Sequence, residues 1–121
     1  MSVEISGINA EKGLELYDGE LEFFIFALRS WVKNTPPVLE KMHDVSAETL
    51  QDYIVNVHGV KGTSAHIGAE TLREAAAELE KLAKAGDLSG VQALNKNLMT
   101  QAQALVENVQ NWLKNNAPEE D

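Results

Sequence analysis

The chain has 121 residues, 44% of them apolar, with no cysteine, and its 19 acidic and 10 basic residues give a formal net charge of −9. This length predicts a single domain over residues 1–121, with a frayed acidic tail over 115–121. The absence of cysteine excludes disulfides, thiolate catalysis and iron–sulfur clusters, and the negative charge argues against nucleic acid and anionic membranes as partners. Because no apolar run is long enough to span a bilayer and no signal peptide is evident, we expect a cytoplasmic domain.

Apolar residues recur at helical rather than strand spacing along the whole chain. The first part of this pattern predicts a short helix over 10–17, with Asn9 as its N-cap, and a second helix over about 20–34. Pro36 and Pro37 are expected to interrupt the second helix, because proline has no backbone N–H to donate, with a further turn or two beyond them.

Three longer amphipathic segments follow. Ser46 is expected to cap a third helix that ends at Gly68, the fourth spans about 69–85, and Asp87 or Ser89 begins the last. Four long amphipathic helices joined by short loops predict an all-α fold, an antiparallel up-down four-helix bundle with a short additional N-terminal helix. The last helix should bury a stripe of near-heptad spacing that comprises Val91, Leu94, Leu98, Leu105 and Trp112.

The third predicted helix separates an apolar stripe from a histidine. His58 lies roughly 130° from the centre of this stripe on a helical wheel, so its imidazole should face water. The stripe, which should form the core, comprises Leu50, Tyr53, Val57, Val60, Ser64 and Ile67. The face of His58 also carries Ile54, Lys61, Gly62 and Ala65.

Two glycines within the same helix require a reason, since each costs about 1 kcal/mol relative to alanine in a helix interior. Gly59 could allow close packing of a neighbouring helix or belong to a binding surface. Gly62 shares the exposed face with His58, where a side chain four residues further on would block a partner approaching the imidazole. We therefore expect a docking surface around His58 that includes Ile54, Gly62 and Ala65.

Residues 58–69, with the sequence HGVKGTSAHIGA, resemble the signature of histidine-containing phosphotransfer (HPt) domains of bacterial-type phosphorelays. That family typically has histidine, an apolar residue at +2, lysine at +3, glycine at +4, small residues and then Gly-Ala. The segments 7–9 and 13–14 resemble the family's N-terminal part, and 79–80 resembles its later Leu-Glu pair. The resemblance covers nearly the whole chain.

The resemblance implies that His58 accepts a phosphoryl group from the aspartyl phosphate of a receiver domain and passes it to another receiver aspartate. An exposed imidazole that is largely neutral near pH 7 is a competent nucleophile for this step. Lys61, one turn along, could place its ammonium against the phosphoryl oxygens. Glu80 on the next helix is the candidate for holding the ring tautomer, since family members often carry Gln or Glu there.

The same resemblance implies response-regulator receiver domains and a hybrid histidine kinase as partners, with magnesium on the receiver and no cofactor on this chain. We expect a monomeric phosphocarrier rather than an enzyme, because the sequence shows no ATP-binding elements. No metal site is expected, since the Glu-x-x-His pattern of Glu40 and His43 occurs once, whereas a di-iron bundle needs it twice. The alternative is a helical adaptor that docks receivers or other helices without becoming phosphorylated.

Overall fold

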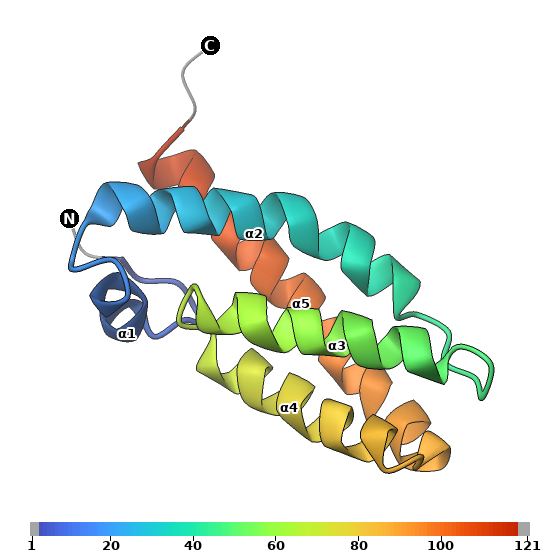
Figure 1. Ribbon diagram of the computed structural model, residues 1–121. Helices are drawn as coiled ribbons and strands as arrows, with labels where there is room; N and C mark the ends of the chain where they lie inside the picture. The colour runs from blue at the N-terminus through green and yellow to red at the C-terminus, as the bar shows by residue number, and fades with distance from the viewer. Residues whose placement is uncertain (1–2, 119–121) are drawn as a thin grey trace.

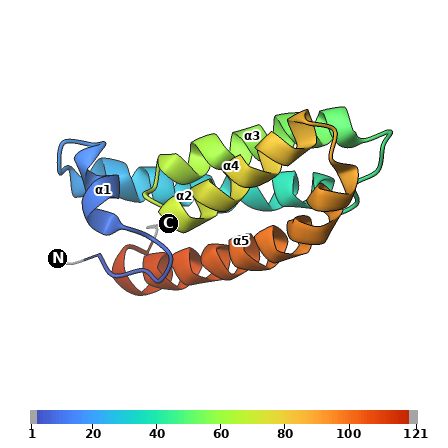
Figure 2. The ribbon, with the colours of Figure 1, turned by 90° about the horizontal axis from the view of Figure 1, so that it is seen from below.

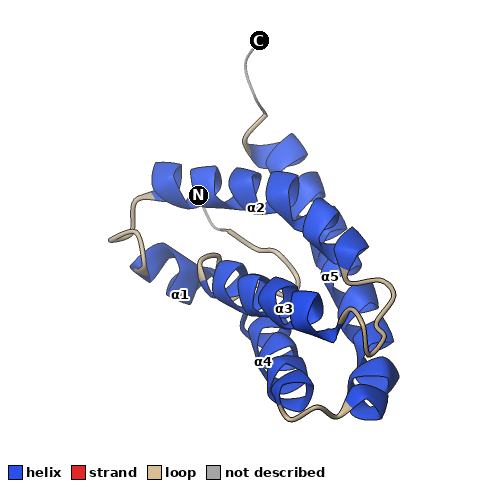
Figure 3. Cartoon of the chain, turned by 45° about the vertical axis from the view of Figure 1, so that its right-hand side comes forward, coloured by secondary structure: helices blue, strands red, loops and turns tan. Residues whose placement is uncertain are grey.

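The computed structural model describes residues 3–118, where all regular secondary structure is helical (Figure 1 and Figure 3). The five helices of this part are α1 (Ala10–Glu15), α2 (Leu21–Lys41), α3 (Leu50–Ala65), α4 (Glu70–Lys84) and α5 (Leu88–Asn116). The all-α prediction is therefore confirmed. None of the described helices is both long and apolar enough to cross a membrane.

The four long helices enclose one core. α2 packs against α3 and α5, and α4 also packs against α3 and α5, so the four helices close a ring. α3 and α4 make the most extensive contact and run side by side in both Figure 1 and Figure 2. α1 packs against α2. The largest fully buried side chains come from all four long helices and include Phe24, Leu28, Val57, Leu72, Leu79, Leu98 and Val109.

The predicted interruption of the second helix at its two prolines is wrong. α2 runs without a break from Leu21 to Lys41 and contains both Pro36 and Pro37. Each proline removes one backbone hydrogen bond, but both rings lie on the exposed side of the helix. Leu39 and Met42, beyond the prolines, are almost completely buried. Burial of these two side chains offsets the lost hydrogen bonds and keeps the last turn helical.

The predicted acidic tail begins later than expected. α5 continues to Asn116, so the first two positions of the range 115–121 are helical. The carbonyl of Ala117 then accepts a hydrogen bond from the Arg29 guanidinium, which fastens the end of α5 to α2. Residues 119–121 of the predicted tail lie outside the described residues.

The predicted core stripe of α3 is confirmed over most of its length. Leu50 in the first turn is half-buried, and the fully buried members are Tyr53, Val57, Val60, Ser64 and Ile67. The predicted cap, Ser46, lies in the turn before the helix, where the Thr49 N–H donates to Ser46 Oγ at 3.3 Å and the Ser46 N–H donates to Thr49 Oγ1 at 2.9 Å. These reciprocal bonds close the turn but do not cap α3, whose N-cap is Thr49 and whose first residue is Leu50, so the prediction that Ser46 is the N-cap is wrong.

A polar contact replaces one of the predicted apolar contacts of α5. Leu94 is 41% exposed, so its predicted place in the core stripe is wrong, and Asn95 is buried instead. Asn95 Oδ1 accepts a hydrogen bond from the Tyr53 hydroxyl, and Asn95 Nδ2 donates to the Met42 carbonyl, both at 2.8 Å. With both of its polar groups paired, the buried amide links α5 to α3 and to the end of α2.

The turn between α3 and α4 is held by the N-terminal segment. Gly68 has a φ of +74°, and the next N–H, that of Ala69, donates back to the Ser64 carbonyl at 2.9 Å, which closes the end of α3. The Asn9 N–H donates to the Gly68 carbonyl at 2.8 Å, and Asn9 Oδ1 accepts from the Lys12 N–H at 3.1 Å, as its predicted role of N-cap requires. A Cβ at Gly68 would collide with the Asn9 carbonyl.

Alanine substitution should therefore cost more at Gly68 than at Gly86, the matched control. Gly86 has a similar φ of +76° at the end of α4, but nothing lies within 4 Å of a Cβ placed there. We expect Gly86→Ala to lower the free energy of unfolding by about 1–2 kcal/mol, the cost of a left-handed non-glycine residue. Gly68→Ala should lower it further, because the Asn9 backbone must also move. Urea unfolding followed by circular dichroism measures both, and equal losses would contradict this account of the turn.

Candidate functional site

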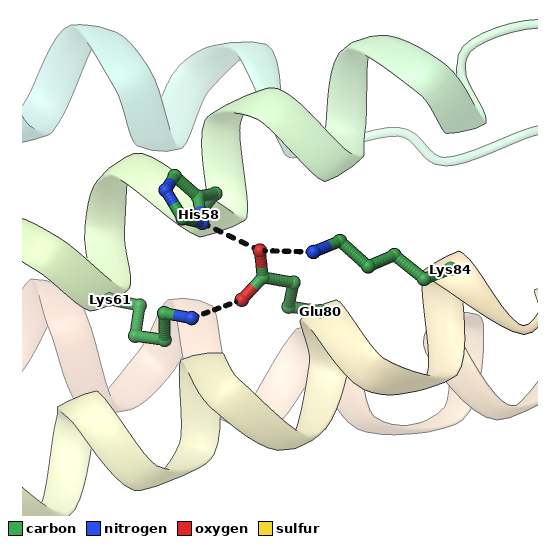
Figure 4. Close-up of polar contacts among 4 residues, drawn as sticks. All are labelled: His58, Lys61, Glu80 and Lys84. Carbon is green, nitrogen blue, oxygen red and sulfur yellow. Dashed lines mark hydrogen bonds and ion pairs between the residues drawn. The ribbon is translucent and has the colours of Figure 1, made fainter.

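The His58 ring presents its two nitrogens to different surroundings. Its side chain projects from the middle of α3 and is 64% exposed, and Nδ1 lies 2.6 Å from Oε2 of Glu80 on α4 (Figure 4). Because an ionised carboxylate only accepts hydrogen bonds, Nδ1 carries the hydrogen and donates it. In the neutral imidazole the lone pair is then on Nε2, which points away from Glu80 in Figure 4.

Glu80 is a buried carboxylate that three donors surround. It is only 4% exposed, and besides His58 it binds Lys61 Nζ at 2.5 Å through Oε1 and Lys84 Nζ at 3.2 Å through Oε2. The hydrogen bond from Lys61 is the main cause that lowers the pKa of Glu80 from its ordinary value of 4.5 to about 2. Burial acts in the opposite direction, and the bonds from His58 and Lys84 lower this pKa further. Glu80 is therefore ionised at neutral pH.

The close association of α3 and α4 brings these side chains together. His58 and Lys61 are three residues apart on α3, and Glu80 and Lys84 are four residues apart on α4, so each pair shares one face of its helix. The site is thus assembled from two helical faces across one interface.

The other residues predicted around His58 lie on the same part of α3. Ile54, Gly62 and Ala65 are all half-buried. A Cβ placed at Gly62 or at Gly59 would have no atom within 4 Å, so neither glycine is needed for close helix packing. The prediction that Gly59 allows close packing of a neighbouring helix is therefore wrong. The two glycines leave a strip of bare backbone beside the imidazole.

An apolar groove beyond the glycines is a feature that the sequence pattern missed. It lies between α2 and α3, encloses about 400 Å³, and is lined by Phe23, Phe26, Trp31, Gly59, Val60 and Thr63 among others. Phe23 and Phe26 are 59% and 70% exposed. The available signal is the run of residues 23–26, Phe-Phe-Ile-Phe, which is more apolar than one face of a surface helix can bury.

The remaining histidines lack the surroundings of His58. His43 and His66 are exposed, and within residues 3–118 neither makes a side-chain hydrogen bond. The backbone carbonyl of His66 accepts a hydrogen bond from the Tyr17 hydroxyl at 2.8 Å, which fixes the backbone but not the ring. In the described chain, His58 is thus the histidine whose ring is held in one orientation by a carboxylate.

An exposed imidazole nitrogen with a fixed lone pair, set beside lysines on a helical bundle, defines a site suited to group transfer through histidine. The family model of the Hpt domain matches residues 27–112, which is most of the chain and includes all of α3 and α4. The chain therefore belongs to the Hpt domain family, whose members are phosphocarrier modules of two-component phosphorelays and not kinases. Comparisons with curated proteins and with solved structures gave no match.

Replacing Glu80 with glutamine should weaken the acid dependence of folding. Because the folded-state pKa of Glu80 lies below its ordinary value, its ionised form stabilises the fold above pH 4.5, and this contribution is lost as the pH falls towards about 2. The difference in the free energy of unfolding between the wild type and Glu80→Gln should decrease over this range. Urea unfolding at a series of pH values measures it, with Glu78→Gln, an exposed carboxylate of the same helix, as control. A difference that stays constant would mean that the ionisation of Glu80 is not coupled to folding.

Proposed function

We propose that the chain is a phosphorelay intermediate in which His58 accepts a phosphoryl group from a receiver-domain aspartyl phosphate and passes it to another receiver aspartate. The observation that carries this proposal is the 2.6 Å contact between His58 Nδ1 and Glu80 Oε2. It leaves Nε2 exposed with its lone pair available, as a nucleophile that reacts with a partner protein must be.

The transfer step requires little movement within this chain. The Nε2 lone pair forms the bond to phosphorus, the bond from phosphorus to the aspartyl oxygen breaks, and its electron pair stays on the aspartate. The ring gains a positive charge and keeps its Nδ1 proton, which remains hydrogen-bonded to Glu80. The ionised carboxylate stabilises this charge, and the reverse sequence delivers the phosphoryl group to the next aspartate.

Lys61 is the side chain we assign to the phosphoryl oxygens. Its ammonium is bound to Glu80 Oε1, and its side chain is 33% exposed, so it can turn from the carboxylate towards an incoming phosphoryl group. A positive charge there would stabilise the transferring group, for which positioning and charge are the main catalytic requirements. Magnesium and the acidic residues that bind it would belong to the receiver, and this chain would need no cofactor.

The surface around His58 supports docking of receiver domains. Gly62 provides bare backbone next to the imidazole, with Ile54 and Ala65 on the same face, and the groove that contains the exposed Phe23 and Phe26 lies beyond it. We infer a monomeric cytoplasmic phosphocarrier without kinase activity that serves receivers and a hybrid histidine kinase. Short loops between successive helices and the closed ring of packed helices support an antiparallel up-down bundle as its scaffold.

His58→Gln should abolish phosphate acceptance while leaving the fold intact. The side chain is 64% exposed, and glutamine keeps an N–H donor for the buried Glu80 carboxylate, so we expect the helical fold to be retained. After incubation with phosphorylated receiver domains, the wild type should acquire acid-labile, base-stable phosphate, and His66→Gln, the matched control, should acquire it equally. Phosphate retained by a folded His58→Gln variant would move the role to another histidine. Receiver binding without any phosphate on the wild type would instead support the adaptor function.

Gly62→Gln should separate docking from stability. Since a Cβ at Gly62 meets open space, Gly62→Ala should raise the free energy of unfolding by up to about 1 kcal/mol, and Gly62→Gln should match or exceed the wild type. The glutamine side chain would occupy the space beside His58 that a receiver must enter. We expect phosphotransfer to fall by about 100-fold, the loss typical of a misplacement of about 1 Å between reacting groups.

Single-turnover transfer and thermal unfolding measure the two properties, with Gly62→Ala as the variant of minimal bulk. A clear drop in Tm for Gly62→Gln would mean that Gly62 is required for packing. Unimpaired transfer in a stable variant would mean that the partner approaches over another face.

A further inference from the structure

Lys84, in the last turn of α4, binds the same carboxylate oxygen as His58. Its Nζ lies 3.2 Å from Glu80 Oε2, the atom that accepts the 2.6 Å hydrogen bond from His58 Nδ1. Figure 4 shows Lys84 approaching this oxygen from the side opposite to His58. The ammonium and Nδ1 are therefore no further apart than these two distances combined, with the oxygen between them.

The formal charges at this site do not cancel. Glu80 carries one negative charge, which Lys61, bound to its other oxygen at 2.5 Å, is sufficient to balance. Lys84 adds a second positive charge, so the site is already positive while the imidazole is neutral. Protonation of the ring would place another positive charge in the same cluster, which Coulomb repulsion disfavours.

We propose that Lys84 is a positioning residue for phosphotransfer that acts through Glu80 to keep the His58 imidazole neutral, with its lone pair on Nε2. This inference rests on the proposed function of His58. Lys84 lies on the Nδ1 side of the ring, whereas a phosphoryl group would be bound to Nε2 on the other side (Figure 4). A protonated ring has no lone pair on Nε2 and accepts no phosphoryl group, so Lys84 extends phosphate acceptance to lower pH.

The charged groups that face the imidazole come from two helices. α3 contributes Lys61, and α4 contributes Glu80 and Lys84. On the α2 side of α3, the described residues that line the groove include no Asp, Glu, Lys or Arg. The same lining contains two further titratable side chains, Tyr17 and His66, so the charged groups bound around the imidazole are one carboxylate and two lysines. The Lys84 side chain is 60% exposed, so its replacement leaves the core intact.

The test is the pH dependence of phosphate acceptance from phosphoramidate, a small phosphoryl donor that needs no docking surface. In Lys84→Met the pH of half-maximal rate should rise by about half a unit, the effect of one charge at this separation in a water-like dielectric. The rate at high pH should remain near that of the wild type. Lys84→Arg should restore the profile, and Lys81→Met, an exposed lysine in the same part of α4, should leave it unchanged.

Glu80→Gln and Glu80→Gln/Lys84→Met complete a double-mutant cycle. Because Glu80 holds the exposed Lys84 ammonium next to the ring, Lys84→Met should shift the profile of the wild type by more than that of Glu80→Gln, in which the ammonium is released. An unchanged profile in Lys84→Met, with His58 still phosphorylated, would overturn the role of Lys84, and so would an equal shift in both backgrounds. Failure of the wild type to acquire phosphate on His58 from both phosphoramidate and phosphorylated receivers would contradict the proposed function itself.

Discussion

A buried carboxylate is costly to place in a protein unless charged donors surround it, and the burial of Glu80 imposes this requirement on two helices. His58 and Lys61 from α3 and Lys84 from α4 supply the donors. The same contacts orient the imidazole and place two ammonium groups around it. A single electrostatic requirement thus determines the ring orientation and the local charge, and it adds polar contacts to the packing of α3 against α4.

The two nitrogens of the His58 ring have different surroundings, one inside this chain and one open to solvent. One ring nitrogen of His58 is committed to Glu80, and the other is left to solvent. Next to the ring, Gly62 offers backbone without side-chain bulk, and the groove beyond it exposes Phe23 and Phe26. In the proposed function, a partner would therefore meet the exposed nitrogen of His58 on a surface that offers apolar contact on one side and positive charge on the other.

The main features of the fold followed from apolar spacing, and the departures have physical causes. Spacing placed His58 outside the core and Glu80 on the helix that packs beside it. Apolar spacing predicted the wrong buried residue at Leu94 and Asn95, because it assigns burial to apolar residues alone. The amide of Asn95 is buried because the Tyr53 hydroxyl and a backbone carbonyl form hydrogen bonds with it. Apolar spacing also failed at the prolines of α2, where tertiary burial outweighs a local preference. Lys84 is an i,i+4 partner of Glu80 within α4, but the contacts of Glu80 with His58 and Lys61 cross from one helix to another, and no single helix pattern contains them.

The short connection between α3 and α4 has a consequence for the order of folding. His58 and Glu80 are 22 residues apart in sequence and lie on consecutive helices joined by the turn at Gly68. Closing a loop of this length costs less chain entropy than joining distant segments, and contacts of low sequence separation form early. The polar cluster around His58 is therefore a local element of low contact order, contained in one helical hairpin. Its four side chains can come together before the long C-terminal helix packs against them.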